Sequence, residues 1–195
     1  AAGILNSDVD VHHHGETREL YGSATEKALV QAGQAAGLSR TRLRRDYPRR
    51  ALRERADGRH YVVSLHDTPK SGRIAFVKGA PEQILPLCTR FAGGPLRPNV
   101  RRRFQRRNEE MAADGLRVLA LGFRRLGRDD DGTREGDFTL LGLAGLRDPV
   151  RPGAADALRS AAAAGIRTVI LTGDQRRTAE ATARAVGLHG RALDG

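Results

Sequence analysis

The chain has 195 residues, a formal net charge of +11 and a hydrophobic content of 39%. This length suffices for one full domain and part of another, and no stretch approaches the roughly 20 apolar residues of a membrane helix. The single cysteine, Cys88, cannot form an internal disulfide, which favours a reducing cytoplasmic setting. We therefore expect a soluble protein in which Cys88 is a small buried residue near the end of a helix.

Helix and strand patterns mix in the first three quarters of the chain. Apolar residues that include Leu29, Ala32 and Ala36 recur at helical spacing and predict a helix over 26–37. The other elements predicted in this part are strands over 61–65, 74–77, 117–124 and 138–146 and helices over 81–87 and 100–114. Hairpin-loop residues at 67–72 join the first two of these strands. The pattern predicts an α+β fold, with an antiparallel sheet and flanking helices.

The pattern changes in the last quarter of the chain. An Ala-rich helix over 153–164 precedes a run with β-branched residues over 166–170, and a helix-like run over 175–186 follows. This order predicts a strand of a buried parallel sheet between two helices, which is a partial α/β, Rossmann-like segment. The predicted domains are 1–147 and 148–195.

A short polar sequence, Thr172-Gly173-Asp174, stands between that strand and the helix after it. A hydroxyl can donate to a phosphoryl oxygen, glycine lets the backbone approach closely, and the next helix points its N-terminal amides at an anion. Thr172 and Gly173 are therefore placed for a phosphate, and Asp174 suits a helix cap or an Mg²⁺ shell. By itself, the tripeptide is explained better as an N-capping Asp after a turn glycine.

Four short motifs, spread over nearly the whole chain, give the tripeptide its context. They are Gly22-Ser23-Ala24-Thr25-Glu26-Lys27-Ala28-Leu29, Lys78-Gly79-Ala80-Pro81-Glu82, Gly115-Leu116-Arg117-Val118-Leu119-Ala120, and Asp148-Pro149-Val150-Arg151 followed by Thr172-Gly173-Asp174. In order and spacing they resemble the P-type ATPases, and the Lys-Gly-Ala box resembles the cation-pumping branch. The resemblance implies a nucleotide-binding domain followed by part of a haloacid-dehalogenase-like phosphorylation domain.

The adenosine pocket of that family matches Glu26, Lys78 and Arg117 here. The resemblance implies that Glu26 accepts from the adenine amino group, that Lys78 packs its stem on the purine, and that Arg117 bridges outer phosphates. Gly79 would let the ring approach. Each residue also has a simpler explanation, as surface charge for Lys78 and Arg117 and as a first-turn carboxylate for Glu26.

One aromatic of the family pocket has no obvious counterpart. The segment between Tyr47 and Arg59 lacks the phenylalanine that stacks on adenine in many members, and Leu52, Tyr47 or a neighbouring arginine could replace it. Loss of such stacking would weaken nucleotide binding by about tenfold or more.

The resemblance also implies the chemistry. Thr172, Gly173 and Asp174 would hold the phosphoryl group, Asp148 and Arg151 would coordinate the hinge, and the cofactors would be ATP and Mg²⁺. The phosphorylated aspartate of the family lies in Asp-Lys-Thr-Gly-Thr, which does not occur in this sequence. We therefore expect a fragment of an ATP-hydrolysing ion translocase that delivers the γ-phosphate to an aspartate outside this chain.

The same resemblance implies the surroundings of the fragment. The remaining phosphorylation, actuator and transmembrane parts, and the bound transported cation, would lie elsewhere in the same polypeptide. The fragment would work at the cytoplasmic face of the cell membrane.

Two other functions fit parts of the sequence. Asp8-Val9-Asp10 has the spacing of a haloacid-dehalogenase-like phosphatase nucleophile pair, but no apolar strand closely precedes it. Arginines crowd residues 40–59 and 101–107, as in a nucleic-acid-binding module. Helical spacing in the second cluster, few aromatic residues and only three lysines favour solvated faces instead, so a nucleic-acid partner is not expected. His12-His13-His14 lacks further ligand residues nearby and predicts a solvated loop rather than a metal site.

Overall fold

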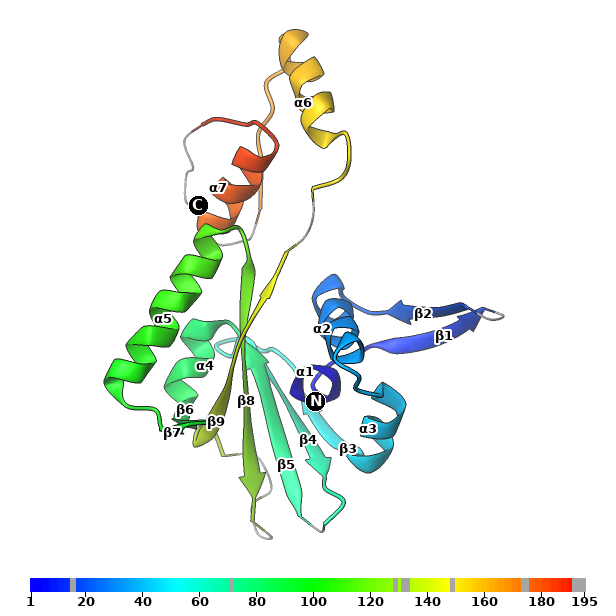
Figure 1. The fold of residues 1–195 in the computed structure, drawn as a ribbon, viewed down its shortest axis with the longest axis vertical. Helices are drawn as coiled ribbons and strands as arrows, with labels where there is room; N and C mark the ends of the chain where they lie inside the picture. Colours follow the sequence, from blue (N-terminus) through cyan, green and yellow to red (C-terminus); the bar gives the residue numbers. More distant parts are fainter. Residues whose placement is uncertain are drawn as a thin grey trace. The chain divides into compact units, whose positions relative to one another are not determined.

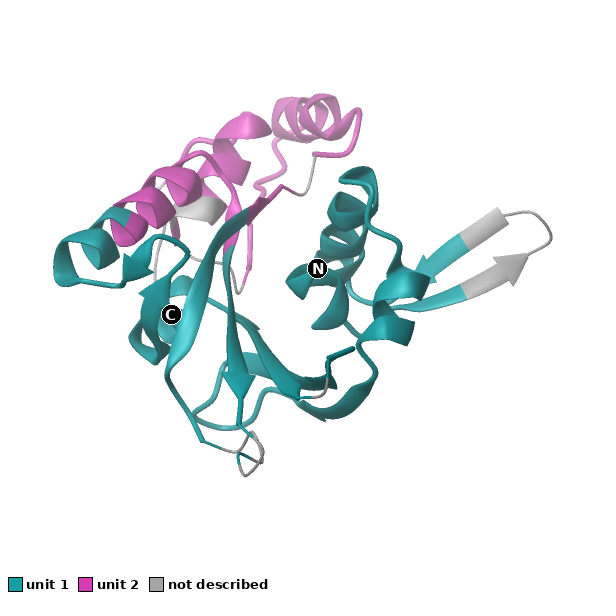
Figure 2. Cartoon of the chain, turned by 60° about the horizontal axis from the view of Figure 1, so that its bottom comes forward, with its two compact units in different colours: residues 1–103, 119–144 teal, residues 104–118, 145–195 magenta. Residues whose placement is uncertain are grey.

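The computed structural model describes residues 1–14, 17–70, 72–127, 130, 134–147, 150–172 and 176–190 (Figure 1). The chain divides into two compact units, which Figure 2 colours separately. The first unit comprises residues 1–103 and 119–144, and the second comprises residues 104–118 and 145–195. The predicted domains 1–147 and 148–195 stay a prediction. Within the described ranges, no helix combines the length and the apolar character needed to cross a membrane.

A seven-stranded sheet forms the centre of the first unit, in the order β3-β4-β5-β8-β9-β6-β7. Its strands are β3 (Arg49–Arg53), β4 (Tyr61–Asp67), β5 (Arg73–Gly79), β6 (Cys88–Phe91), β7 (Gly94–Pro95), β8 (Arg117–Leu126) and β9 (Phe138–Leu146). The pairings from β3 through β4 and β5 to β8 are antiparallel, with Tyr61 opposite Gly79 and Lys78 opposite Val62 and Leu121. The predicted α+β fold with an antiparallel sheet is confirmed, although β6 pairs parallel with β9.

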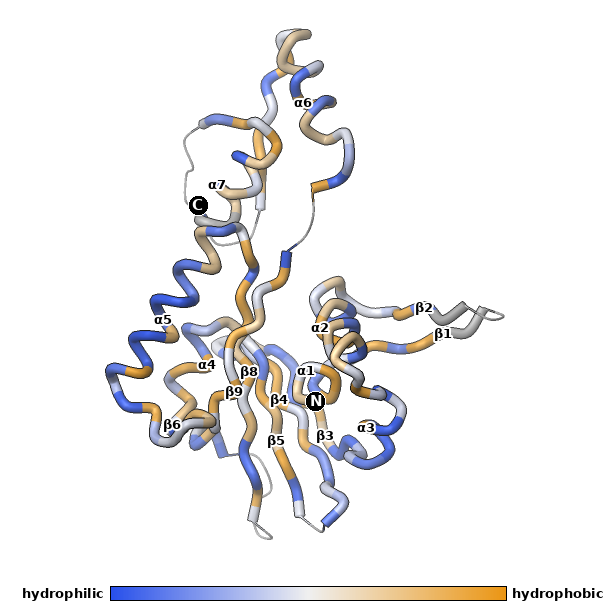
Figure 3. The backbone as a smooth tube through the Cα atoms, viewed as in Figure 1, coloured by the Kyte–Doolittle hydropathy of each residue, from blue (hydrophilic) through white to orange (hydrophobic). Residues whose placement is uncertain are grey.

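Strand β5 lies inside the sheet because it is apolar on both faces. Ile74, Ala75, Phe76 and Val77 are all buried, and Figure 3 shows the hydrophobic colour along this strand. Successive side chains of a strand point to opposite faces, so helices must cover β5 from both sides.

Helices α1 (Ala2–Leu5), α2 (Ala24–Ala35) and α3 (Arg40–Asp46) cover one face of the sheet. A hydrophobic cluster joins α1 to β5, and its members are Ala2, Leu5, Ile74 and Phe76, with Leu43, Tyr47 and Phe123 packed against them. The ring of His66 lies edge-on to Phe76, at 5.6 Å between ring centroids. Tyr47 therefore packs into the core of this face.

The ends of α2 follow from local sequence. The Ser23 hydroxyl accepts a hydrogen bond from the Glu26 amide at 3.3 Å, which caps the helix and places Glu26 in its first turn. Gly37, at φ 79°, follows the last turn in the left-handed conformation that glycine tolerates. The predicted helix over 26–37 is confirmed with an earlier start. Leu29 is buried, whereas Ala32 and Ala36 are exposed, so only part of the apolar pattern faces the core.

Helix α4 (Pro81–Leu87) confirms the helix predicted over 81–87, and it packs against the opposite face of β5. Cys88 follows it directly and is fully buried, and burial raises the pKa of its thiol to about 11. Arg101, in α5 (Pro98–Ala113), donates to the main-chain oxygens of Leu85 and Cys88. This arginine therefore satisfies carbonyls at the C-terminal end of α4.

The region of the three histidines differs from its prediction. Residues Asp10–His14 form β1, which pairs antiparallel with β2 (Thr17–Tyr21), so the predicted solvated loop is wrong. Val11 lies opposite Leu20, and apolar cross-strand pairs of this kind stabilise a hairpin. The connecting Gly15 and Glu16 lie outside the described residues.

The second unit contains α6 (Ala154–Ala163) and α7 (Arg176–Ala185), which confirm the two helices predicted there. The strand predicted over 166–170 is wrong, because these residues have no regular structure. Ile166 and Val169 are 60% and 73% exposed. A strand needs a hydrogen-bonded neighbour, and nothing in the described part of this unit pairs with the segment. The predicted Rossmann-like segment is therefore not formed as a sheet.

Candidate functional site

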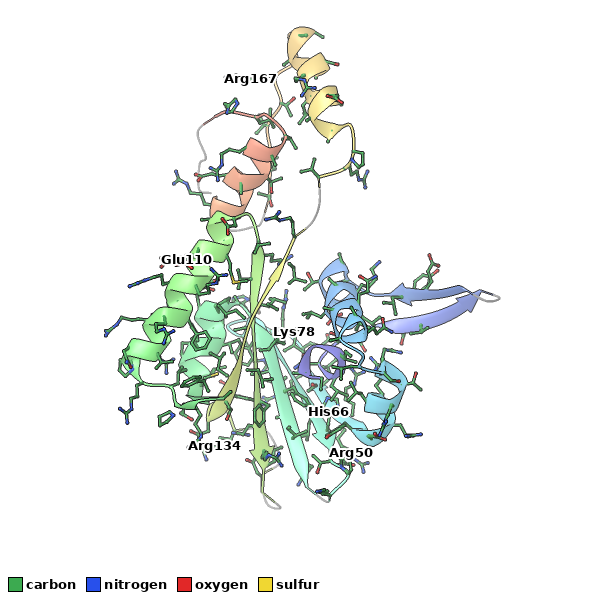
Figure 4. All side chains as sticks on the ribbon, viewed as in Figure 1. Arg50, His66, Lys78, Glu110, Arg134 and Arg167 are labelled. Carbon is green, nitrogen blue, oxygen red and sulfur yellow. The ribbon has the colours of Figure 1, made fainter. Side chains whose placement is uncertain are left out.

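Lys78 and Glu26 form a largely buried ion pair in the first unit. Lys78 is the next-to-last residue of β5, and its position beside the helices of the first face can be followed in Figure 4. Its Nζ lies 2.9 Å from Oε1 of Glu26, and the two side chains are 4% and 21% exposed. Two motifs 52 residues apart in the sequence are thus brought into direct contact.

A third group completes this cluster. The main-chain oxygen of Asn6 accepts a hydrogen bond from Lys78 Nζ at 2.6 Å. Asn6 is the C-cap of α1 and is fully buried. The sequence contained no signal for this contact, because it uses a main-chain carbonyl and does not depend on a recognisable side-chain pattern.

The pKa of Lys78 reflects two opposing effects. Burial lowers the pKa of the ammonium from its usual value, and the positive charge of Arg55 acts in the same direction. The hydrogen bond and the charge of Glu26 oppose this shift, with a smaller contribution from Asp8. A buried amine keeps its charge only where partners of this kind compensate for lost hydration. Glu26 and the Asn6 carbonyl are such partners.

Gly79 is required by the packing of the strands. A Cβ at this position would lie 2.7 Å from Cβ of Tyr61, its partner across the β4–β5 pair, and 3.2 Å from Ile84 Cδ1. Tyr61 and α4 therefore fill the space beside Gly79 on this face, where an approaching ring was expected. Packing alone explains the glycine.

Several predicted site residues belong to the second unit. Arg117 is the first residue of β8 and is exposed, and Arg151 and Thr172 are exposed residues outside helices and strands. The helix predicted after the phosphate loop is present as α7, whereas the strand predicted before it is not. Three further predicted residues, Asp148, Gly173 and Asp174, lie outside the described residues.

A surface pocket of about 550 Å³ lies on the other face of the sheet. Its lining includes Tyr61, Arg59 and the acidic residues Asp57, Glu82 and Glu135. Burial, with a contribution from the hydrogen bond to Glu135, raises the pKa of Tyr61 to about 12. Three carboxylates facing one arginine disfavour an anionic phosphate, so this pocket does not suit the phosphates of a nucleotide.

Part of the arginine cluster has a structural role. Arg44 donates to the main-chain oxygen of Ser7 at 2.9 Å, Arg40 donates to that of Val9, and Arg49 pairs with Asp8 at 3.0 Å. These side chains hold the segment that leads from α1 to β1. They are therefore engaged within the fold, which weakens the nucleic-acid interpretation.

The phosphatase and metal alternatives find no geometric support. Asp8 and Asp10 stand before and at the start of β1, in a hairpin, whereas the nucleophile pair considered above needs the end of a strand. In the ranges that the structure describes, no three or more His, Cys, Asp and Glu residues are grouped so that they could hold a metal ion.

The fold, the ion pair and the order of the motifs together define the class of protein. Residues 1–153 match the family described as P-type ATPase, cytoplasmic domain N, and the chain belongs to this family. Membership agrees with the antiparallel sheet and flanking helices of the first unit.

Individual relatives support the same assignment. The chain is 33% identical over 192 residues to "Cation-transporting ATPase pma1" of Synechocystis sp. and 34% identical over 193 residues to "Probable cation-transporting ATPase F" of Mycobacterium tuberculosis. It is also 34% identical over 195 residues to "Calcium-transporting ATPase type 2C member 1" of Homo sapiens. These matches cover 95–96% of this chain but only 20–21% of each relative. The chain thus spans about a fifth of the length of these relatives.

Proposed function

We propose that this chain binds ATP through its first unit, as the nucleotide-binding part of a cation-transporting P-type ATPase. The observation that carries the proposal is the buried ion pair between Lys78 and Glu26. Burying two charges is costly unless they are paired and hydrogen-bonded, and a perturbed charged group of this kind is characteristic of a functional site. Membership of the P-type ATPase family supports the choice of ATP.

The two residues would have different roles in binding. Glu26 is the more exposed partner, so an incoming adenine amino group would meet its carboxylate first. Lys78 would keep that carboxylate ionised and oriented, and its buried methylenes would form the base of the pocket. Gly79 would serve mainly to bring β4 and β5 together. For Arg117, which belongs to the second unit, the family resemblance implies a contact with the outer phosphates.

Family membership supports a proposal for the wider reaction. Mg²⁺ would be bound together with the triphosphate, and the γ-phosphate would pass to an aspartate outside this chain. Thr172, Gly173 and Asp174 would hold the phosphoryl group, and Asp148 and Arg151 would form the hinge between domains 1–147 and 148–195. Formation and hydrolysis of the aspartyl phosphate would drive cation movement through the transmembrane part of the same polypeptide, at the cytoplasmic face of the membrane.

Titration calorimetry with ATP tests this function on the full 195-residue chain. Lys78→Ala removes a charge and packed methylenes, and we expect binding to weaken by about 1 to 3 kcal/mol, roughly fivefold to 150-fold. Lys70→Ala is the matched control, because Lys70 is an exposed lysine in the β4–β5 turn. Equal ATP affinity for Lys78→Ala and the parent, or no binding by the parent, would contradict the proposal.

A further inference from the structure

Asn6 is a polar residue that the fold buries completely beside Lys78. Its side-chain Nδ2 donates to the main-chain oxygen of Phe76 in β5 at 2.7 Å and to that of Val62 in β4 at 3.3 Å. Val62 is the residue paired with Lys78, and Phe76 lies two positions before Lys78 on the same strand. The amide thus attaches the end of α1 to the strand pair beside the lysine.

The main chain of the same residue makes the second connection. While the side chain donates to the strands, the Asn6 carbonyl accepts from Lys78 Nζ at 2.6 Å. An ammonium carries three N–H donors on a flexible stem, so its position depends on how well its acceptors are fixed. Here the acceptor is held by its own side chain.

The other polar atom of the Asn6 side chain is left without a partner among the described residues. Oδ1 of Asn6 is buried and has no hydrogen-bond partner among the described residues. A buried acceptor without a partner is unfavourable, so the fold tolerates this cost for the two hydrogen bonds that Nδ2 donates to the strands. The two hydrogen bonds from Nδ2 hold the main chain of Asn6 against β4 and β5.

We propose that Asn6 is a positioning residue for nucleotide binding, which fixes the ammonium of Lys78 and through it the carboxylate of Glu26. The proposal rests on the ATP-binding function proposed above. Asn6 itself is inaccessible, so it acts through Lys78 and not by touching the ligand.

A double-mutant cycle on the full chain tests the coupling. ATP affinity would be measured by calorimetry for the parent, Asn6→Ala, Lys78→Met and the double variant. We expect Asn6→Ala to weaken ATP binding about fivefold to tenfold in the parent and to have no further effect beside Lys78→Met, because contacts that act in series are not additive. An equal factor in both backgrounds, or parent-like affinity of Asn6→Ala, would overturn the inference.

Ser64→Ala is the matched control for burial. Ser64 is also fully buried, lies on the same face of β4 as Val62, and has an unpaired side-chain oxygen. Its removal should leave ATP affinity at the parent value. Asn6→Ser, which retains one donor, replaces Asn6→Ala if that variant does not fold, and a smaller loss in the same direction is expected.

A spectroscopic readout separates this inference from the proposed function. The sequence contains only three lysines, Lys27, Lys70 and Lys78, so ¹⁵N-labelled lysine gives few ammonium signals, and Lys78→Met assigns one of them. We expect a slowly exchanging Lys78 signal in the parent and in Ser64→Ala, and its loss in Asn6→Ala. A signal unchanged in Asn6→Ala refutes the positioning role, whether or not ATP binds. If Lys78→Met leaves ATP affinity unchanged while the signal behaves as expected, the proposed function fails although the structural contact is real.

Discussion

His66 makes the stability of the first unit sensitive to pH. The residue is 1% exposed, its Nδ1 hydrogen-bonds to the carbonyl oxygen of Tyr47 at 3.0 Å, and its Nε2 has no hydrogen-bond partner in the described part of the chain. The bond to a carbonyl requires the proton on Nδ1, so protonation would add a buried, unpaired N–H at Nε2. Burial therefore lowers the pKa of His66, and the nearby Arg49 and Arg44 act in the same direction, whereas the Tyr47 carbonyl and Asp67 oppose it.

We expect acidification to destabilise the fold through this residue. In the unfolded chain His66 has a pKa of about 6.5, so below this pH the unfolded chain binds a proton that folded His66 does not. The free energy of unfolding therefore falls by up to about 1.4 kcal/mol per pH unit until the pH reaches the lower pKa of folded His66. His66→Gln should show a smaller decrease in the free energy of unfolding between pH 7.5 and 5.5, measured with urea. The exposed His60→Gln is the control, and the same decrease in all three proteins would contradict the prediction.

The site residues differ in how far the sequence could identify them. Lys78 and Glu26 were predicted because each lies in a motif whose order along the chain is informative, and the structure joins them. Asn6 was not predicted, because its carbonyl contact depends on how the turn after α1 lies against β4 and β5. Gly79 was predicted to make room for the adenine ring, whereas the structure shows that the close approach of Tyr61 requires a glycine there.

At the scale of elements, local signals explain the successes and the errors. Capped helices such as α2, with Ser23 before it and Gly37 after it, are recognisable because both signals lie within the element. Strand β1 was missed because a polar run of histidines carries little strand signal until its partner β2 is known. The prediction of a strand over 166–170 was wrong because residues with a high strand propensity form no strand without a neighbouring strand to pair with.

Residues 167–171 should therefore be among the least protected in the chain. They lie outside helices and strands, and Leu171 is 96% exposed, whereas Val63 and Val77 lie in the paired strands β4 and β5. Amide hydrogen exchange should label 167–171 early and the β4–β5 pair late. Equal protection of the two segments would show that the segment pairs in solution, for example with a second chain.

At the scale of the whole molecule, binding and chemistry should be separable. The sequence contains no Asp-Lys-Thr-Gly-Thr motif, which carries the phosphorylated aspartate in the family. We therefore expect the isolated chain to bind ATP without forming an acyl phosphate and with no more than trace hydrolysis. Incubation with ³²P-labelled ATP followed by acid quenching checks this. An acid-stable, hydroxylamine-sensitive phosphoprotein would show that a nucleophile lies within the chain.

The geometry of the cluster around Lys78 also determines which basic amino acid fits at residue 78. Basic residues are elsewhere almost entirely arginine, yet here a single buried ammonium nitrogen meets a carbonyl at 2.6 Å and a carboxylate at 2.9 Å. A guanidinium is planar and broader, and its donors diverge as a fork that needs acceptors lying side by side in one plane. An oxygen from the end of α1 and another from the start of α2 suit a compact tetrahedral donor instead. In this arginine-rich protein the geometry therefore favours lysine over arginine at residue 78.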